Sequence, residues 1–165
     1  MFIQGLQKLT LLDYPDHLAC TVFTQGCNFR CPFCHNGSLV KNKDLENRIE
    51  EDEFFKFLNT RSTILDGVCV TGGEPTLQPD LPEFLKKVKD MGFLVKLDTN
   101  GYRPEVLKNI VNSGLADYVA MDIKNSKEKY RQTIGIENFD ISNILESVEF
   151  LTAGKVDYED RTTVV

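Results

Sequence analysis

Residues 19–36 read ACTVFTQGCNFRCPFCHN, and this stretch decides how the rest of the chain is interpreted. Its first part, ACTVFTQ at 19–25, is rich in Val, Phe and Thr and is therefore typical of a β-strand. The second part places Cys27, Cys31 and Cys34 in one short loop directly after that strand. Three thiolates at this spacing can converge on one metal centre. We therefore predict a metal site at the end of a strand.

The composition is that of an ordinary globular protein. The chain has 165 residues, of which 41% are hydrophobic and 27% charged, so we expect a single domain over 1–165 with a lead-in segment at 1–18. The net charge is -6, and no block of Lys and Arg could neutralise a phosphate backbone. We therefore expect no nucleic-acid partner.

The chain shows no signal for secretion or for a membrane. Its N-terminus has no basic stretch followed by an apolar run, and no later segment has enough consecutive apolar residues to cross a bilayer. We therefore expect a cytoplasmic protein without a membrane partner. Cytosolic thiols stay reduced, so the five cysteines favour metal binding over disulfides.

Strand-like runs alternate with helical patterns along the rest of the chain. Strands are expected at 67–71, 93–98 and 117–123, with a fifth beginning at Arg161; helices are expected at 51–60, from Pro82, from Pro104 and at 140–153. Helical connections of this length predict parallel strands in right-handed β-α-β units. The fold class is therefore α/β.

Three polar motifs follow these strands directly. They are GGEP at 72–75, DTNG at 98–101 and the Asp-Ile-Lys of 122–124. In barrels and open α/β sheets the carboxyl ends of the strands hold the active site. We therefore expect the three motifs and the cysteine loop to meet at one edge of the sheet.

The metal could be zinc or iron. Zinc would need a fourth ligand, and His35 is a poor candidate because it directly follows Cys34. Cys20 and Cys69 lie within expected strands, where a small buried side chain is the simpler interpretation. A 4Fe-4S cluster with three thiolate ligands would keep one iron open for a non-protein ligand. A zinc-binding module remains the alternative.

The cysteine spacing, with aromatic Phe33 before the third cysteine, resembles the radical S-adenosylmethionine (radical SAM) enzymes. The resemblance implies a (β/α)6 barrel fold and a 4Fe-4S cluster held by Cys27, Cys31 and Cys34. The open iron would chelate S-adenosylmethionine. GGEP also matches the family, which implies that Gly72, Gly73 and Glu74 lie against the methionine moiety, where Glu74 can accept from an ammonium group.

The CHN of 34–36, DTNG and Asp-Ile-Lys resemble the branch of the family that activates glycyl radical enzymes. The resemblance implies that the cofactor region includes Phe33, His35, Asn36, Asp98, Asn100 and Lys124, and that a monovalent cation binds at Asp98, Thr99 and Asp122. Hard oxygen ligands suit such an ion. Alternatively, the two aspartates are turn residues at strand ends and Lys124 is a solvated charge.

Residues 5–15, GLQKLTLLDYP, together with 22–36, are most similar to activating proteins of anaerobic ribonucleoside-triphosphate reductase. Asp16 stands where such proteins commonly have glycine, which should affect only a turn. The family typically completes six β-α units, so we expect a partial barrel truncated in or after its fifth strand, with an open edge.

The resemblance implies an oxidoreductase that works in an anaerobic setting. It would form a 5'-deoxyadenosyl radical and generate a glycyl radical on a partner enzyme, with flavodoxin or ferredoxin as electron donor. The alternatives are a radical SAM enzyme acting on a small molecule or peptide, and an inactive remnant that still binds a cluster.

Overall fold

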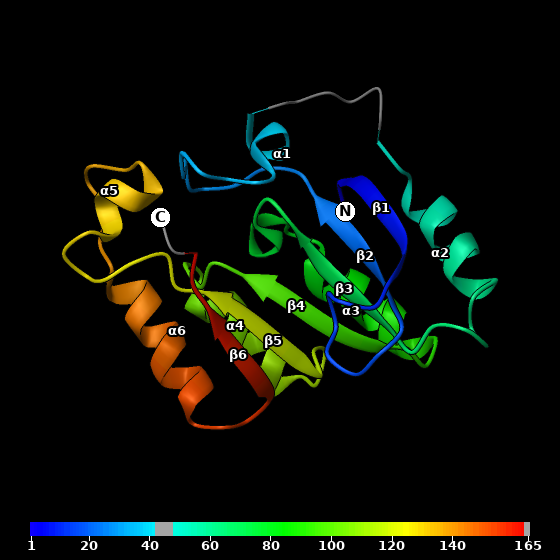
Figure 1. Ribbon diagram of the computed structural model, residues 1–165. Coiled ribbons are helices and arrows are strands. Elements are labelled where there is room, and N and C mark those ends of the chain that lie inside the picture. Colours follow the sequence, from blue (N-terminus) through cyan, green and yellow to red (C-terminus); the bar gives the residue numbers. More distant parts are fainter. Residues whose placement is uncertain (42–47, 164–165) are drawn as a thin grey trace.

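The structure is a computed structural model that describes residues 1–41 and 48–163. Within these residues, six strands form one sheet in the order β1-β2-β3-β4-β5-β6 (Figure 1). The strands are β1 (Ile3–Thr10), β2 (Ala19–Thr24), β3 (Gly67–Gly72), β4 (Leu94–Thr99), β5 (Tyr118–Asp122) and β6 (Asp157–Arg161). The helices are α1 (Gly37–Lys41), α2 (Glu51–Asn59), η1 (Pro75–Leu77), α3 (Leu81–Asp90), α4 (Pro104–Asn112), α5 (Tyr130–Ile134) and α6 (Ser142–Thr152).

Strands β2 to β6 run parallel, which confirms the predicted α/β class. Their carboxyl ends are level: Thr24 of β2 pairs with Gly72 of β3, and Asp122 of β5 pairs with Arg161 of β6. The loops that follow β2, β3, β4 and β5 therefore start at the same edge. The sheet stays open between β1 and β6, as in a partial barrel.

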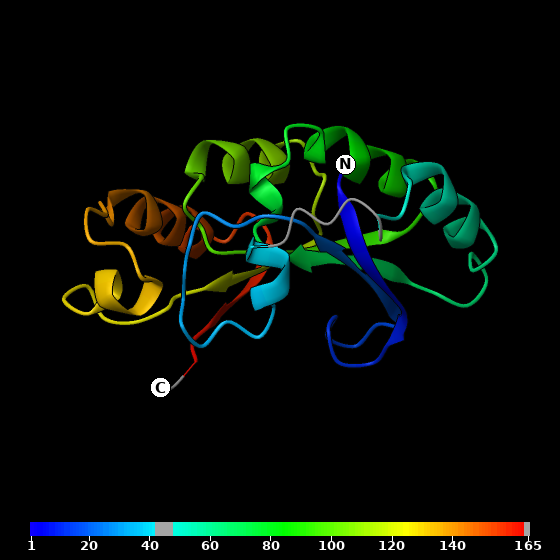
Figure 2. The same cartoon turned by 90° about the horizontal axis from the view of Figure 1, so that it is seen from above.

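Helices α2, α3, α4 and α6 lie along one side of the sheet, whereas the loop before β2 lies on the other (Figure 2). Each of these helices turns an apolar face inward, as the helical spacing predicts. Phe54 of α2 and Phe84 of α3 are buried and pack with ring centroids 5.3 Å apart. Leu107 and Ile110 of α4 are fully buried. The core between the sheet and these helices is apolar, and the polar motifs are left at the strand ends.

The last strand lies earlier than the sequence predicts. The expected start, Arg161, is the end of β6, whose sequence is DYEDR. Four charged residues in five hide the strand pattern, because β6 is an edge strand whose inward side chains meet charges rather than an apolar core. Glu159 and Arg161 form ion pairs with Lys96 and Asp98 of β4.

The lead-in segment contains a strand that the sequence pattern does not predict. β1 pairs antiparallel with β2 and has irregular register between Gln7 and Thr10. In the turn that follows, Asp16 has φ 62°, a left-handed conformation that glycine adopts without strain. The position where similar proteins commonly have glycine is thus one that favours it.

No helix among the described residues is long and apolar enough to span a bilayer.

Candidate functional site

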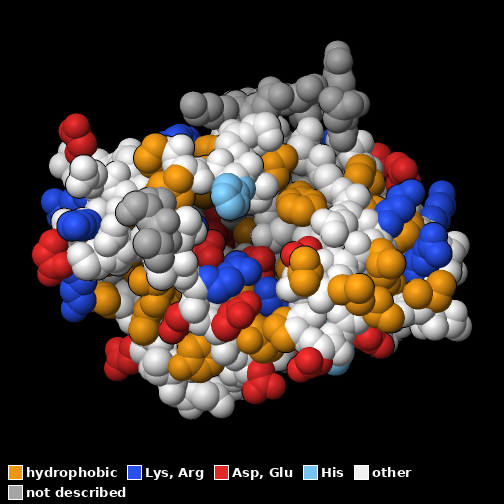
Figure 3. All heavy atoms as spheres, in the orientation of Figure 1, with side chains coloured by type: hydrophobic (Ala, Val, Ile, Leu, Met, Phe, Trp, Pro, Cys, Tyr) orange, Lys and Arg blue, Asp and Glu red, His pale blue; other side chains and the backbone are white. Residues whose placement is uncertain are grey.

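The four motifs meet around one cavity of about 410 Å³ at the carboxyl ends of the parallel strands. Figure 3 shows a hollow near the middle of this face, with acidic and basic side chains side by side along it. All of the site residues expected from the sequence line the cavity: Cys27, Cys31, Phe33, Cys34, His35, Asn36, Gly72, Gly73, Glu74, Asp98, Thr99, Asn100, Asp122 and Lys124. The lining residues that the sequence did not indicate include Asp13, Phe29 and Arg161.

The cysteine loop is held by main-chain contacts. The amide of Phe29 donates to the Cys27 sulfur at 3.3 Å, and the amide of Arg30 donates to the Ile134 carbonyl of α5 at 2.8 Å. The Arg30 guanidinium also donates to the Cys27 and Phe29 carbonyls, at 2.6 and 2.7 Å. These bonds fix the loop between its first two cysteines.

Phe29 anchors the loop in an aromatic cluster. Its buried ring packs edge-on against Phe139 and Tyr130, with centroids 5.5 and 6.4 Å away, and against Tyr102 at 6.2 Å. The three partners come from the segments after β4 and β5, so the cluster joins three loops of the site. Phe29 lies between Cys27 and Cys31, and the sequence pattern alone indicates no role for it.

Two main-chain hydrogen bonds hold the GGEP loop against the start of the cysteine loop. Gly73 N donates to the Thr24 carbonyl at 2.9 Å, and Glu74 N donates to the Gly26 carbonyl at 2.7 Å. A Cβ on Gly73 would lie 1.9 Å from the Gly26 oxygen, and a Cβ on Gly72, whose φ is 119°, would lie 2.2 Å from Thr24 N. Glycine is therefore required at both positions even without a ligand, because the two loops approach too closely for any side chain.

Glu74 is a buried carboxylate at the centre of the site, with 1% of the residue exposed. Its Oε1 accepts from Thr76 N, Thr76 Oγ1 and Thr99 Oγ1 at 3.1, 2.6 and 2.7 Å. Its Oε2 accepts from Asn100 N at 2.7 Å. Burial raises the pKa of Glu74, against the lowering effect of these donors. Oε2, with one donor, keeps capacity for another.

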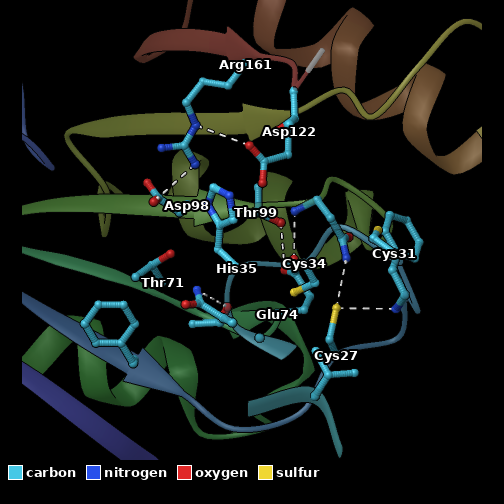
Figure 4. A pocket seen from close by; sticks show the side chains of 18 of the residues that line it. Cys27, Cys31, Cys34, His35, Thr71, Glu74, Asp98, Thr99, Asp122 and Arg161 are labelled. Carbon is cyan, nitrogen blue, oxygen red and sulfur yellow. Dashed lines mark hydrogen bonds and ion pairs between the residues drawn. The ribbon is translucent and has the colours of Figure 1, made fainter. Parts of the chain in front are cut away.

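Asp98 and Asp122 both form ion pairs with the side chain of Arg161. The Arg161 guanidinium lies between them, with Nη2 3.2 Å from Asp98 Oδ2 and Nε 3.3 Å from Asp122 Oδ1 (Figure 4). Lys96 and Lys124 complete the network, with Nζ 2.8 Å from Asp98 and Asp122, respectively. Opposite charges thus alternate across the ends of β4, β5 and β6.

Thr99 points away from this network, because its hydroxyl donates to Glu74. His35 and Cys34 are exposed at the mouth of the cavity, and Phe33 is partly buried. Asn36 donates from Nδ2 to the Gly72 carbonyl at 3.2 Å. Cys20 and Cys69 are fully buried, as expected for structural positions.

The donor set fits a four-iron cluster. The three loop cysteines are free thiols that line one cavity. Among the described residues, no three His, Cys, Asp or Glu side chains are gathered around a single-ion position. A 4Fe-4S cluster binds each thiolate through a different iron, so its ligands need not converge on one point. Burial raises the pKa of Cys27 to about 11, so a bound metal would have to displace a proton there.

Comparison with known proteins gives a consistent result. Residues 21–165 match the radical SAM superfamily. The chain is 35% identical over 167 residues to MJ1227 of Methanocaldococcus jannaschii, provisionally named a glycyl-radical enzyme activating enzyme, and the match covers 99% of this chain and 68% of that one. It is 31% identical over 157 residues to the pyruvate formate-lyase-activating enzyme of Clostridium pasteurianum, covering 89% and 63%. The crystal structure of QueE from Escherichia coli shares the fold, with TM-score 0.56 and 13% identity over 98% of this chain and 94% of that chain.

Proposed function

Because this chain belongs to the radical SAM superfamily, we propose that it activates a glycyl radical enzyme by reductive cleavage of S-adenosylmethionine. The observation that carries the proposal is the convergence of the three loop cysteines, the GGEP loop, DTNG and Asp-Ile-Lys on one cavity. The similarity to two proteins named as activating enzymes supports this branch of the superfamily. The chain spans 68% and 63% of their lengths, so the activity is a proposal for the whole protein.

When bound, the cluster and S-adenosylmethionine would supply the electron transfer and carbon–sulfur cleavage that give methionine and a 5'-deoxyadenosyl radical. Cys27, Cys31 and Cys34 would each hold one iron of the cluster. Glu74 Oε2 offers an acceptor for the ammonium of the methionine moiety. The Lys124 ammonium would pair with the carboxylate of the methionine moiety. Asp122 already holds this ammonium in place, with Oδ2 2.8 Å from Lys124 Nζ.

The proposed substrate is a backbone glycine of a partner enzyme. This glycine would give one hydrogen atom to the 5'-deoxyadenosyl radical, leaving a glycyl radical and 5'-deoxyadenosine. We place anaerobic ribonucleoside-triphosphate reductase first among partners because residues 5–15 and 22–36 resemble its activating proteins. Flavodoxin or ferredoxin would supply the electron. Such a cluster is sensitive to oxygen, so an anaerobic, cytoplasmic setting belongs to the proposal.

A monovalent cation beside the cofactor is a further part of the proposal. Asp98 and Asp122 face the same cavity and supply hard oxygen ligands. They would share their charge with Arg161, whereas the Thr99 hydroxyl is engaged by Glu74. Binding of S-adenosylmethionine to the reconstituted protein, measured by equilibrium dialysis with and without potassium, tests this part. Equal affinity for S-adenosylmethionine in both buffers would contradict the proposed cation site.

The central experiment measures 5'-deoxyadenosine. The protein is reconstituted anaerobically with iron and sulfide and then mixed with S-adenosylmethionine and dithionite. We expect four irons per chain and formation of 5'-deoxyadenosine. Uptake of one zinc and no iron would instead indicate a zinc-binding module, and a full cluster without product would indicate an inactive remnant.

The partner is tested separately by electron paramagnetic resonance. Adding the ribonucleotide reductase should give a glycyl radical signal, which a reductase with the radical glycine changed to alanine should not give. Product formation without a glycyl radical on any candidate partner would favour an enzyme that acts on a small molecule or peptide.

A further inference from the structure

Asn100, directly after β4, connects the buried Glu74 carboxylate to the first cysteine of the loop. The residue is buried, with 5% exposed. Its main-chain N–H donates to Glu74 Oε2 at 2.7 Å. Its side-chain Nδ2 donates to Asn28 Oδ1 at 2.8 Å and lies 3.9 Å from the Cys27 sulfur (Figure 4 shows the contacts of Cys27).

The Asn100 carboxamide has only one orientation that satisfies these partners. Its Oδ1 accepts from Tyr102 N at 3.0 Å, so the nitrogen must face Asn28 and Cys27. A carboxamide nitrogen has two N–H groups, and the two acceptors use both. One N–H is bonded to Asn28 Oδ1, and the other is directed at the Cys27 sulfur. The bond from Tyr102 N to Asn100 Oδ1 fixes this orientation.

We propose that Asn100 is a positioning residue that sets the reduction potential of the cluster through the Cys27 sulfur. The inference rests on the proposed function, since it requires an iron-sulfur cluster at this loop. An N–H group places the positive end of its dipole at the sulfur, which favours the more negative, reduced cluster. Phe29 N, 3.3 Å from the same sulfur, acts in the same direction, so Cys27 receives one main-chain and one side-chain donor.

The Asn100→Asp variant isolates the donor. Aspartate keeps the shape and the Oδ1 acceptor for Tyr102 N, and the main-chain bond to Glu74 is unaffected. It loses both side-chain N–H donors and places an acidic oxygen near the sulfur. Asn100→Ala removes the donor without that oxygen, at the cost of the Tyr102 contact. Asn143→Ala is the matched control, because its carboxamide donates to the Tyr102 carbonyl and not to a cysteine.

The test is a redox titration of the reconstituted proteins, without S-adenosylmethionine or partner, followed by electron paramagnetic resonance of the reduced cluster. We expect the midpoint potential to shift to more negative values in Asn100→Ala and further in Asn100→Asp, with iron content unchanged. Asn143→Ala should titrate like wild type.

Equal potentials in wild type and both Asn100 variants would overturn the inference, even if the variants bind S-adenosylmethionine more weakly. Weaker binding alone would assign Asn100 to cofactor contact. Loss of iron from both folded Asn100 variants would also overturn it, because Asn100 would then hold the loop and not tune it. A wild-type protein that takes up no iron contradicts the proposed function instead, so the two failures are distinguishable.

Discussion

Replacing Glu74 by glutamine should destabilise the protein even though it removes a buried charge. In the better orientation, the glutamine oxygen takes the Oε1 position, where three donors converge. Its amide nitrogen then faces Asn100 N, which donates to Oε2 over 2.7 Å in the wild type. A charge-assisted hydrogen bond is lost and two buried N–H groups face each other.

The magnitude follows from opposing effects. Loss of a hydrogen bond to a charged group costs about 1.5–3 kcal/mol, and an unsatisfied buried donor adds to this. Removing the charge recovers part of the desolvation cost that raises the pKa of Glu74. We expect a net loss of about 2 kcal/mol, which for a domain of this size lowers Tm by roughly 4–8 °C.

Urea unfolding of the metal-free protein measures this loss. The control is Glu149→Gln on α6, where the side chain is exposed and the change should stay within about 0.5 kcal/mol. Equal unfolding midpoints for wild type and Glu74→Gln would refute the reasoning, because Glu74 could not then be the acceptor that holds Asn100 N.

The difference between wild type and Glu74→Gln should also depend on pH. The folded-state pKa of Glu74 is raised, so the folded protein binds more protons than the unfolded chain between the two pKa values. The stabilising contribution of this group therefore grows as pH falls and is lost as pH rises through that window. The variant lacks it, so the gap in unfolding free energy between the two proteins should widen as pH falls towards the ordinary carboxyl value of 4.5. A constant gap would contradict the raised pKa.

Three other substitutions have defined outcomes. Cys31→Ala should abolish iron uptake on reconstitution, whereas Cys69→Ala should retain a normal cluster; iron analysis would reverse the assignment if the results were exchanged. Gly73→Ala should cost about 3 kcal/mol in urea unfolding because its Cβ would lie 1.9 Å from a main-chain oxygen, whereas Gly37→Ala, with nothing within 4 Å, should be nearly neutral. Asp16→Gly should raise the free energy of unfolding by up to about 1 kcal/mol by relieving φ 62°, and a clear loss would show that the aspartate side chain makes a needed contact.

The parallel strands and the meeting of the motifs could be predicted because each signal is local. A β-rich run followed by a polar loop identifies a strand end, and parallel topology brings such ends together. Every site residue expected on this basis lines the cavity. Their roles towards cluster and cofactor stay predictions.

The features that the sequence did not indicate depend on partners far along the chain. β1 mixes polar and apolar residues without clear alternation, and only pairing with β2 makes it a strand. Arg161 acquires its position from register, since β6 places it opposite Asp122. Lys96 was the one available clue: a lysine within the apolar run FLVKLD is fully buried here and is paired with Asp98. A buried lysine needs a counter-charge, so it could have indicated an ionic network.

The main-chain hydrogen bonds between the cysteine loop and the GGEP loop limit how this site can be grafted onto another protein. Gly73 N and Glu74 N bond to main-chain oxygens that flank the start of the cysteine loop. A designer who grafted residues 26–36 alone onto another protein would take the ligands and leave behind the backbone that shapes them. A portable unit therefore includes at least two adjacent parallel strands, β2 and β3, each with its following loop, together with the segments after β4 and β5 that contact Phe29 and Arg30.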